Sequence, residues 1–301
     1  PAAAPPPPAA APPPLPPPPR GCLRCPKCFD PQQVCIGHED AVFQVFPECI
    51  KYSKAIPVSE NYFCNRGVYR CPGTGVQVTL PRMTDEELGH LYGKYYSGQA
   101  RFTSPDNPRS VGQAKAIREQ GGWRGRQDLV IVEIGCAAGY VLYNLQDLAA
   151  NNGQLICFEG DPDLHKRLGG TFKAVSEKYP NAKTKLVPSL FQVGALAESS
   201  IDVFTSSHVL EHHPNPCEVF EEVFRILRPG GVMFSEIPFQ AYNFNASQHA
   251  SANAFLFGKK VYEGQFHITL FSKESFKVAM RTAGFELIWN EGRRFVHRKP
   301  R

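Results

Sequence analysis

The segment VIVEIGCAAGY, residues 130–140, is the feature that most constrains how this chain can fold. A short apolar run leads into two closely spaced glycines, Gly135 and Gly139, and apolar residues at helical spacing follow them. Because glycine has no Cβ atom, it lets the chain turn sharply after a strand and lets the backbone approach a ligand closely. This order of features predicts the first strand, turn and helix of a nucleotide-binding α/β domain.

The rest of the chain repeats this alternation of apolar runs and helical patterns. We expect helices to begin after Gly139 and at Pro162, Pro216 and Ser272. The expected strands are residues 129–134, 154–158, 184–188, 201–207, 231–237 and 285–289. The predicted fold class is α/β, with a doubly wound, mostly parallel, Rossmann-like sheet and a small Cys-rich module before it.

The helix expected at Pro216 has the clearest start signal in the chain. Asn215 is placed to cap it, Pro216 takes its first position, and Glu218 favours a capping box. The segment LRPGG, residues 227–231, is expected to end this helix.

Composition divides the chain into four parts. Residues 1–20 are almost entirely proline and alanine, which cannot form a core and predict a disordered stem. Residues 21–98 hold most of the cysteines and are interpreted as a separate module. Residues 99–127 form a connecting segment with a helix near 110–120, and residues 128–301 form the main domain.

An acidic residue follows the expected second strand. Glu159 lies about twenty residues after the glycine turn, where a carboxylate can accept both hydroxyls of a ribose. This spacing predicts binding of an adenosine group. A nicotinamide dinucleotide is disfavoured, because Tyr140 stands where the dinucleotide fingerprint needs a third glycine. A turn that only reverses the chain is the alternative.

Four segments, taken in order, resemble the successive motifs of the class I S-adenosylmethionine-dependent methyltransferases. They are VIVEIGCAAGYVL, ICFEGDPDLHKRL, the run from IDVFTSSHVLEHH to GGVMFSEIP, and FHITLFSKESFKVAMRTAGFELI. The resemblance covers residues 128–290 and implies S-adenosylmethionine as cofactor. Ala137 departs from the family, which usually has glycine there, and residues 188–194 lack an acid for the adenine amino group.

The resemblance also implies the residues that hold the cofactor. Those around its methionine part are Glu133, Gly135, Cys136 and Gly139; Glu159, followed by Gly160, holds the ribose; Ser206 and His208 lie beside the sulfonium.

The candidate catalytic residues come from two segments. His208, Glu211 and His212 follow the fourth strand, at the carboxyl edge where such sheets bind ligands, and His267 comes from the segment after the fifth strand. Methyl transfer needs a base only if the acceptor atom carries a proton, and histidine suits that role near neutral pH. The alternative is that Glu211 and His212 only orient the loop.

The cysteines before residue 72 have metal-knuckle spacing. The candidate zinc ligands are Cys22, Cys25, Cys28 and Cys71, with Cys35, His38, Cys49 and Cys64 as further candidates. This segment resembles the N-terminal zinc-binding module of some sugar and small-molecule methyltransferases. The alternative is that these cysteines form disulfides of a secretory-pathway protein.

These observations lead to one function and one alternative. We expect an enzyme that uses S-adenosylmethionine to methylate oxygen or carbon of a small polar molecule, with a sugar or glycan among the candidates. The alternative is a catalytically silent binding or scaffold protein with the same fold.

Partners and compartment are constrained less. The net charge is +5, but Lys and Arg are scattered among acidic residues rather than gathered into a nucleic-acid-binding face. We expect no membrane span, because no run of about 18 apolar residues occurs. The compartment stays open between the cytoplasm and, if an upstream anchor or signal is absent from this chain, the secretory-pathway lumen. The oligomeric state stays open too.

Overall fold

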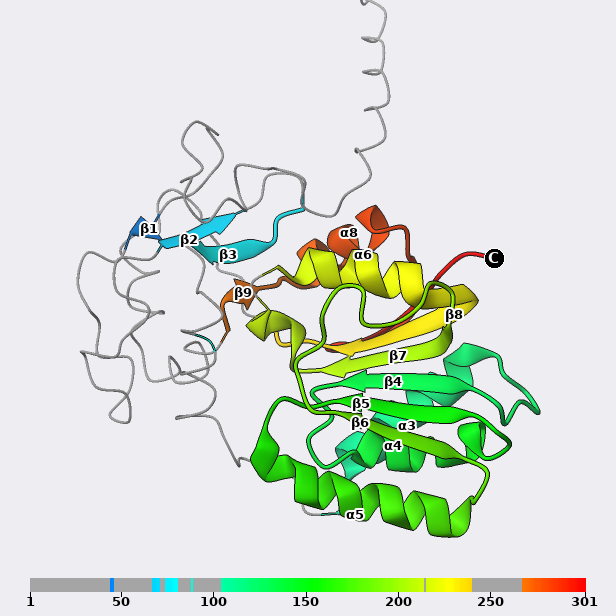
Figure 1. Ribbon diagram of the computed structural model, residues 1–301. Helices are drawn as coiled ribbons and strands as arrows, with labels where there is room; N and C mark the ends of the chain where they lie inside the picture. The colour runs from blue at the N-terminus through cyan, green and yellow to red at the C-terminus, as the bar shows by residue number, and fades with distance from the viewer. Residues whose placement is uncertain are drawn as a thin grey trace, which may run out of the picture.

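A seven-stranded sheet forms the centre of the protein (Figure 1). The computed structural model describes residues 44–45, 67–70, 74–80, 88, 104–213, 215–239 and 267–301. The strand order is β10-β11-β8-β7-β4-β5-β6. The strands are β4 (Val130–Ile134), β5 (Gln154–Phe158), β6 (Lys183–Val187), β7 (Ile201–Ser207), β8 (Leu227–Glu236), β10 (Glu286–Glu291) and β11 (Arg294–Arg298). Strands β6, β5, β4, β7 and β8 are mutually parallel, and β11 is antiparallel to both of its neighbours.

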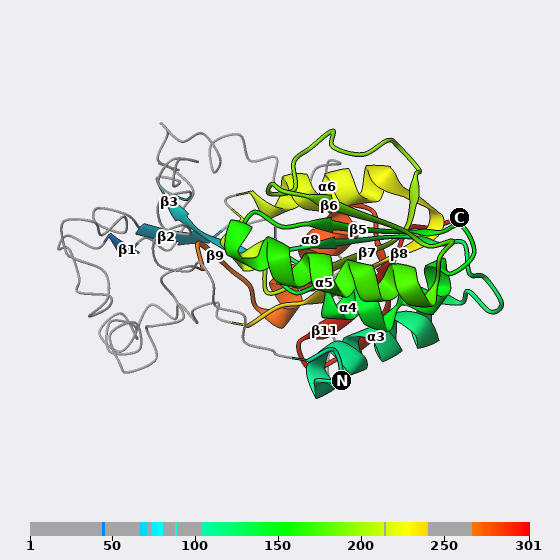
Figure 2. The ribbon, with the colours of Figure 1, turned by 60° about the horizontal axis from the view of Figure 1, so that its bottom comes forward.

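Helices cover both faces of this sheet (Figure 2). One face is covered by α6 (Pro216–Ile226) and α8 (Lys273–Thr282), and the other by α3 (Pro108–Gly121), α4 (Tyr140–Asn144) and α5 (Pro162–Lys178). The short helices η3 (Gln146–Ala149) and η4 (Leu210–His212) complete the connections after β4 and β7. The predicted doubly wound, mostly parallel arrangement is confirmed.

Alternation along the strands explains why the sheet has two cores. Side chains of successive strand residues point to opposite faces. Ile131 therefore packs with α3, α4 and α5, whereas Val132 packs with α6 and α8. Val203 and Phe204 divide in the same way. Burial on both faces requires the nearly continuous apolar runs from which these strands were predicted.

A smaller antiparallel sheet connects distant parts of the chain. Its order is β1 (Gln44–Val45), β2 (Gly67–Arg70), β3 (Gln77–Leu80) and β9 (Thr269–Leu270). Val76 and Val78 are buried in the core that α6 and α8 cover. Figure 1 shows this sheet beside the main one, and β9 leads from it into α8. The smaller sheet therefore ties the segment before residue 100 to the main domain.

Two local expectations differ from the structure. All six expected strands form, but the sequence pattern missed β11, which inserts between β8 and β10. Asn215 is the N-cap residue of α6, yet its side chain makes no capping hydrogen bond, so the predicted capping box is wrong. Its backbone N–H donates instead to His213 Nδ1 over 3.1 Å. The helix does end before LRPGG, but those residues already belong to β8.

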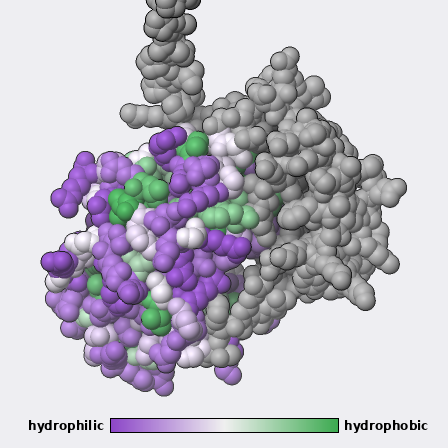
Figure 3. Space-filling view, turned by 180° about the vertical axis from the view of Figure 1, so that it is seen from behind, coloured by the Kyte–Doolittle hydropathy of each residue, from purple (hydrophilic) through white to green (hydrophobic). Residues whose placement is uncertain are grey.

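The surface of the described part is mostly polar. Its exposed large apolar residues are Val111, Leu190, Val193 and Leu287. The side seen in Figure 3 is largely hydrophilic with scattered apolar residues. No helix in the described ranges is both long and apolar enough to cross a membrane.

Candidate functional site

The glycine turn after β4 has the conformation for which its glycines were singled out. Gly135 and Gly139 have φ of +58° and +72°, in the left-handed region. A Cβ atom on Gly135 would lie 2.5 Å from Val209 Cγ2, and one on Gly139 would lie 2.6 Å from Leu168 Cδ1. Neither position accommodates a side chain without rearrangement. Ala137 also has a positive φ of +50°, which explains why glycine suits that position better.

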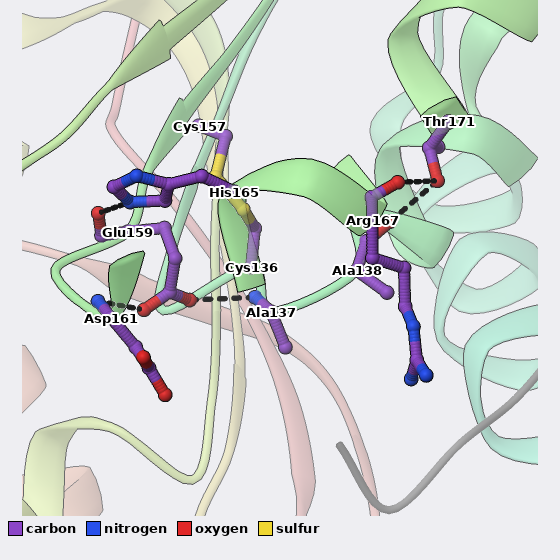
Figure 4. Close-up of a disulfide and its surroundings, with 9 residues drawn as sticks. All are labelled: Cys136, Ala137, Ala138, Cys157, Glu159, Asp161, His165, Arg167 and Thr171. Carbon is purple, nitrogen blue, oxygen red and sulfur yellow. Dashed lines mark hydrogen bonds between the residues drawn. A yellow bond between two sulfur atoms is a disulfide. The ribbon is translucent and has the colours of Figure 1, made fainter. Parts of the chain in front are cut away.

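Glu159 holds the turn from the end of β5 (Figure 4). Its Oε2 accepts a hydrogen bond from Ala137 N over 2.8 Å, and its Oε1 accepts one from Asp161 N over 2.9 Å. Burial raises the pKa of this carboxyl, although the two backbone donors act in the opposite direction. Each oxygen keeps a lone pair for a further donor, as binding of two ribose hydroxyls requires.

Glu133 lies under the same turn, near the end of β4. It is buried, and burial raises its pKa to about 8, with a backbone donor at Leu142 opposing the shift and the charge of Glu159 adding to it. Oε2 of Glu133 has no hydrogen-bond partner among the described residues. A buried acceptor without a donor is costly, so this atom is suited to a donor supplied by a ligand. We call Glu133, Gly135, Gly139 and Glu159 the cofactor cradle.

Cys136 contributes to this cradle only through its backbone. Its sulfur is bonded to that of Cys157, and the two Cα atoms are 5.9 Å apart (Figure 4). Its carbonyl accepts a hydrogen bond from Gly139 N over 2.7 Å, which closes the turn. Gly160 follows Glu159 and lies against Leu190, since an added Cβ would be 3.1 Å from Leu190 Cδ2.

A second group of side chains follows β7, and we call His208, Glu211, His212 and His267 the histidine–glutamate cluster. Glu211 Oε1 lies 3.2 Å from His208 Nδ1, 4.0 Å from His212 Nε2 and 3.9 Å from His267 Nε2. The rings of His212 and His267 meet edge to face, with centroids 4.7 Å apart. The structure therefore brings together all four predicted catalytic residues, although His267 is far from the others in sequence.

Glu211 is the buried centre of this cluster. Its side chain is 1% exposed, and neither carboxylate oxygen receives a well-formed hydrogen bond from the described residues. Burial would raise its pKa, but the surrounding imidazoles of His208, His212 and His267 outweigh burial and lower it. The charged form is therefore favoured.

His208 has an unusual backbone conformation for a residue with a side chain. Its φ is +54°, and its N–H donates to the Glu236 carbonyl over 2.9 Å. Its Nε2 lies 3.7 Å from Glu236 Oε1. Burial alone would lower the pKa of His208, but Glu211 and Glu236 outweigh it and raise the pKa. Ser206, the other residue expected near the sulfonium, is buried, and its Oγ has no partner in the described ranges.

Sequence reasoning missed Glu236 and the residues that hold it. Glu236 Oε2 accepts a hydrogen bond from Gln113 Nε2 over 2.7 Å, and its carboxylate pairs with Arg109 and Arg294 over 3.3 Å and 3.2 Å. Burial opposes ionisation of Glu236, but these donors and His208 lower its pKa to about 2. An acid at the end of a parallel strand was a usable signal for Glu236, whereas its partners on α3 and β11 could not be read from sequence.

The proposed zinc ligands cannot be placed. Cys22, Cys25, Cys28 and Cys71 lie outside the described residues. The same holds for the further candidates Cys35, His38, Cys49 and Cys64.

Comparison with known proteins identifies the family of this chain. A family model described as a methyltransferase domain matches residues 109–289, more than half of the chain. The chain belongs to this methyltransferase family. The match includes the cofactor cradle and the whole histidine–glutamate cluster.

Individual relatives are distant. A ubiquinone biosynthesis O-methyltransferase of Xanthomonas oryzae is 29% identical over 106 residues, covering 35% of this chain and 41% of the relative. An uncharacterized methyltransferase of Mycobacterium bovis is 28% identical over 103 residues, covering 34% and 37%. The matched part of this methyltransferase thus spans about two fifths of these relatives.

Two solved structures of low identity are similar to part of this chain. An arsenic(III) S-adenosylmethionine methyltransferase of Chlamydomonas reinhardtii has a TM-score of 0.43 at 15% identity, covering 64% of this chain and 73% of that one. A SAM-dependent methyltransferase of Aquifex aeolicus has a TM-score of 0.44 at 12% identity, covering 65% and 98%.

Proposed function

We propose that this protein transfers a methyl group from S-adenosylmethionine to a hydroxyl oxygen of a small polar molecule, with a sugar or glycan as the first class to test. The observation that supports this most is the cofactor cradle. It combines a buried, unpartnered oxygen of Glu133, a turn that admits no side chains at Gly135 and Gly139, and the carboxylate of Glu159.

Each part of the cradle suits one part of this cofactor. Glu133 Oε2 is available to accept a hydrogen bond from the ammonium of the methionine portion. The glycines allow the left-handed backbone of the turn, and this tight turn would bring backbone groups close to the methionine portion. Glu159 has two oxygens that are held in place by Ala137 and Asp161 and can each accept one ribose hydroxyl.

S-adenosylmethionine, when bound, supplies a methyl group on a positively charged sulfur. The protein then has mainly to align the acceptor and remove its proton. We assign proton removal to His208, whose ring lies between Glu211 and Glu236. The neutral imidazole of His208 would accept the proton of the acceptor hydroxyl and later return it to solvent. The acceptor oxygen would then take the methyl group that S-adenosylmethionine, held by the cofactor cradle, would supply.

The choice of oxygen on a small polar acceptor is supported by the groups at this edge. His208, Glu211, His212, His267 and Glu236 offer several hydrogen-bonding groups in a small volume. The Xanthomonas relative is named an O-methyltransferase. Carbon methylation remains a second outcome of the test, since it requires the same alignment.

Incubation of the full chain with methyl-labelled S-adenosylmethionine and extracts of metabolites and glycans tests the proposal. We expect label to appear on a small hydroxyl-containing molecule, identified by mass spectrometry. As a control, Glu177→Ala removes an exposed carboxylate on α5 and should label to the same extent. Binding without transfer to any extract would contradict the proposal and favour a silent scaffold protein.

We also propose that residues 21–98 form a zinc-binding module with Cys22, Cys25, Cys28 and Cys71 as ligands. Thiolates at knuckle spacing support this proposal. About one equivalent of zinc in the reduced protein is expected. Intact disulfides among these cysteines, with no metal, would contradict it.

A further inference from the structure

We propose that Glu211, His212 and His267 bind a divalent first-row transition-metal ion of the Zn²⁺ type, and that the ion holds the acceptor oxygen. All three proposed ligands lie among the described residues. Its role toward the acceptor rests on the proposed function.

The three side chains have the ligand types of such a site. Each offers one atom, and the three atoms all lie within 4.8 Å of one another. Two imidazole nitrogens with one carboxylate oxygen form a set that binds Zn²⁺ and similar ions while leaving coordination positions open. Open positions are what a substrate-binding metal site requires.

The separations leave space for an ion at the centre. His212 Nε2 and His267 Nε2 are 4.0 Å and 3.9 Å from Glu211 Oε1, which is too far for hydrogen bonds. Ligand bonds of about 2.0–2.2 Å at tetrahedral angles place neighbouring ligand atoms roughly 3.3–3.6 Å apart. The two separations from Glu211 must therefore shorten by a few tenths of an ångström, and the remaining separation, which is within 4.8 Å, by at most about 1.5 Å.

Charge and burial favour a cation in the same place. Glu211 is 1% exposed and receives no well-formed hydrogen bond from the described residues. A buried carboxylate is stable only when it is paired, hydrogen-bonded or bound to metal. The side chains of His212 and His267 are 11% exposed, so the cluster lies just below the surface and a ligand can reach it.

The fold fixes the relative positions of the three ligands. Glu211 and His212 are adjacent on η4, directly after β7. His267 lies two residues before β9, which pairs with β3 and is also held by a hydrogen bond from Thr269 Oγ1 to the His213 carbonyl over 3.0 Å. The smaller sheet thus brings the distant ligand to the loop that carries the other two.

Metal binding to the metal-free full chain tests the site directly, without any acceptor. We expect calorimetry to show Zn²⁺ binding in addition to the equivalent assigned to the Cys-rich module. The Co²⁺ difference spectrum between the unaltered chain and His267→Ala should show visible bands without the thiolate charge-transfer absorption that cysteine ligands would add. His267→Ala should weaken binding at this site by at least about 100-fold, the upper end of the loss for a residue that only supports a ligand. His267→Asp supplies an oxygen ligand in place of the imidazole nitrogen and should recover part of the metal affinity.

His213→Ala is the matched control, because it removes a histidine of the same loop that is outside the cluster. It should bind metal as the unaltered chain does. Equal metal affinity in His267→Ala and His213→Ala, or no thiolate-free bands in that Co²⁺ difference spectrum, would overturn the proposal. Titration with S-adenosylmethionine on the same samples distinguishes the two proposals. A chain that binds the metal ion but does not bind S-adenosylmethionine would contradict only the proposed function.

Discussion

The two halves of the site at the carboxyl edge of the sheet are built in different ways. The cofactor cradle comes from two neighbouring strand ends. Its shape is set by the backbone conformation at Gly135 and Gly139 and by the backbone N–H groups that donate to the Glu159 carboxylate. The acceptor half, as we propose it, consists of the histidine–glutamate cluster together with Glu236 of β8 and its partners on α3 and β11. A short local sequence therefore specifies the first half, whereas only the complete fold specifies the second.

This difference has a consequence for substitutions. A backbone-built cradle tolerates changes in surrounding side chains but not in its glycines or in the one carboxylate that holds it. The acceptor half is a network around Glu211 and Glu236, so loss of one side chain there changes chemistry more than folding. The following predictions test this separation.

The largest effect is expected from His208→Ala. Turnover should fall by about 10² or more, the usual scale for loss of a general base, while S-adenosylmethionine affinity stays within a few-fold. The ion pairs of His208 are with Glu211 and Glu236, neither of which belongs to the cradle. Calorimetry and a turnover assay on one preparation measure both quantities.

His213→Ala controls for disturbance of the loop, because it lies in the same loop but outside the cluster. Turnover near that of the unaltered chain is expected for this variant. If His208→Ala lost cofactor affinity and thermal stability together while the remaining enzyme turned over normally, His208 would be structural and the two halves would not be separable.

A smaller effect, on the pH dependence of stability, is expected from His297, a buried histidine of β11. It is 1% exposed, lies against Phe276 and Phe295, and burial lowers its pKa to about 3. Above pH 6.5 the imidazole is neutral in both states. Between 6.5 and about 3 only the unfolded chain binds the proton, so the free energy of unfolding decreases as pH falls.

This group should contribute a slope of up to about 1.4 kcal/mol per pH unit in that range. His297→Phe removes the titration, and its stability measured by denaturant unfolding should fall less steeply toward low pH. His165→Gln, which removes a less buried histidine of α5, should keep the slope of the unaltered chain. Parallel curves for His297→Phe and the unaltered chain would contradict the assignment.

The smallest effect is expected in the cradle, from Ala137→Gly. A left-handed conformation costs an alanine about 1–2 kcal/mol, part of which the greater freedom of glycine in the unfolded chain offsets. We expect a gain in stability of less than about 1 kcal/mol, with cofactor affinity equal or higher. Ala138→Gly, at the buried neighbouring position, should instead destabilise. Loss of cofactor affinity in Ala137→Gly would show that the alanine methyl is itself part of the site.

The same contrast explains what could be predicted from the sequence. Strands β4, β5, β7 and β8 were predicted because apolar runs buried on both faces leave a clear signal. Glu159 was singled out because its position relative to the glycine turn is fixed by one strand–helix–strand unit. The positive φ at Ala137 could be anticipated only through family resemblance.

Other features depend on contacts between distant segments. Strand β11 has charged residues at both ends, and only its pairing with β8 and β10 makes it a strand. The contacts of Arg109 and Gln113 with Glu236 cross more than a hundred residues, and no local pattern indicates them. The cap predicted at Asn215 failed because the backbone of that residue bonds to His213.

The central claim is that the cradle holds S-adenosylmethionine through Glu159, and calorimetric titration of the unaltered chain and of Glu159→Ala tests it most directly. The variant loses hydrogen bonds to a charged acceptor, each worth about 1.5–3 kcal/mol, so its dissociation constant should rise by more than tenfold. Glu177→Ala should leave that constant unchanged, because its carboxylate is exposed on α5. Equal affinity in the unaltered chain and Glu159→Ala, or no binding to the unaltered chain, would contradict the claim.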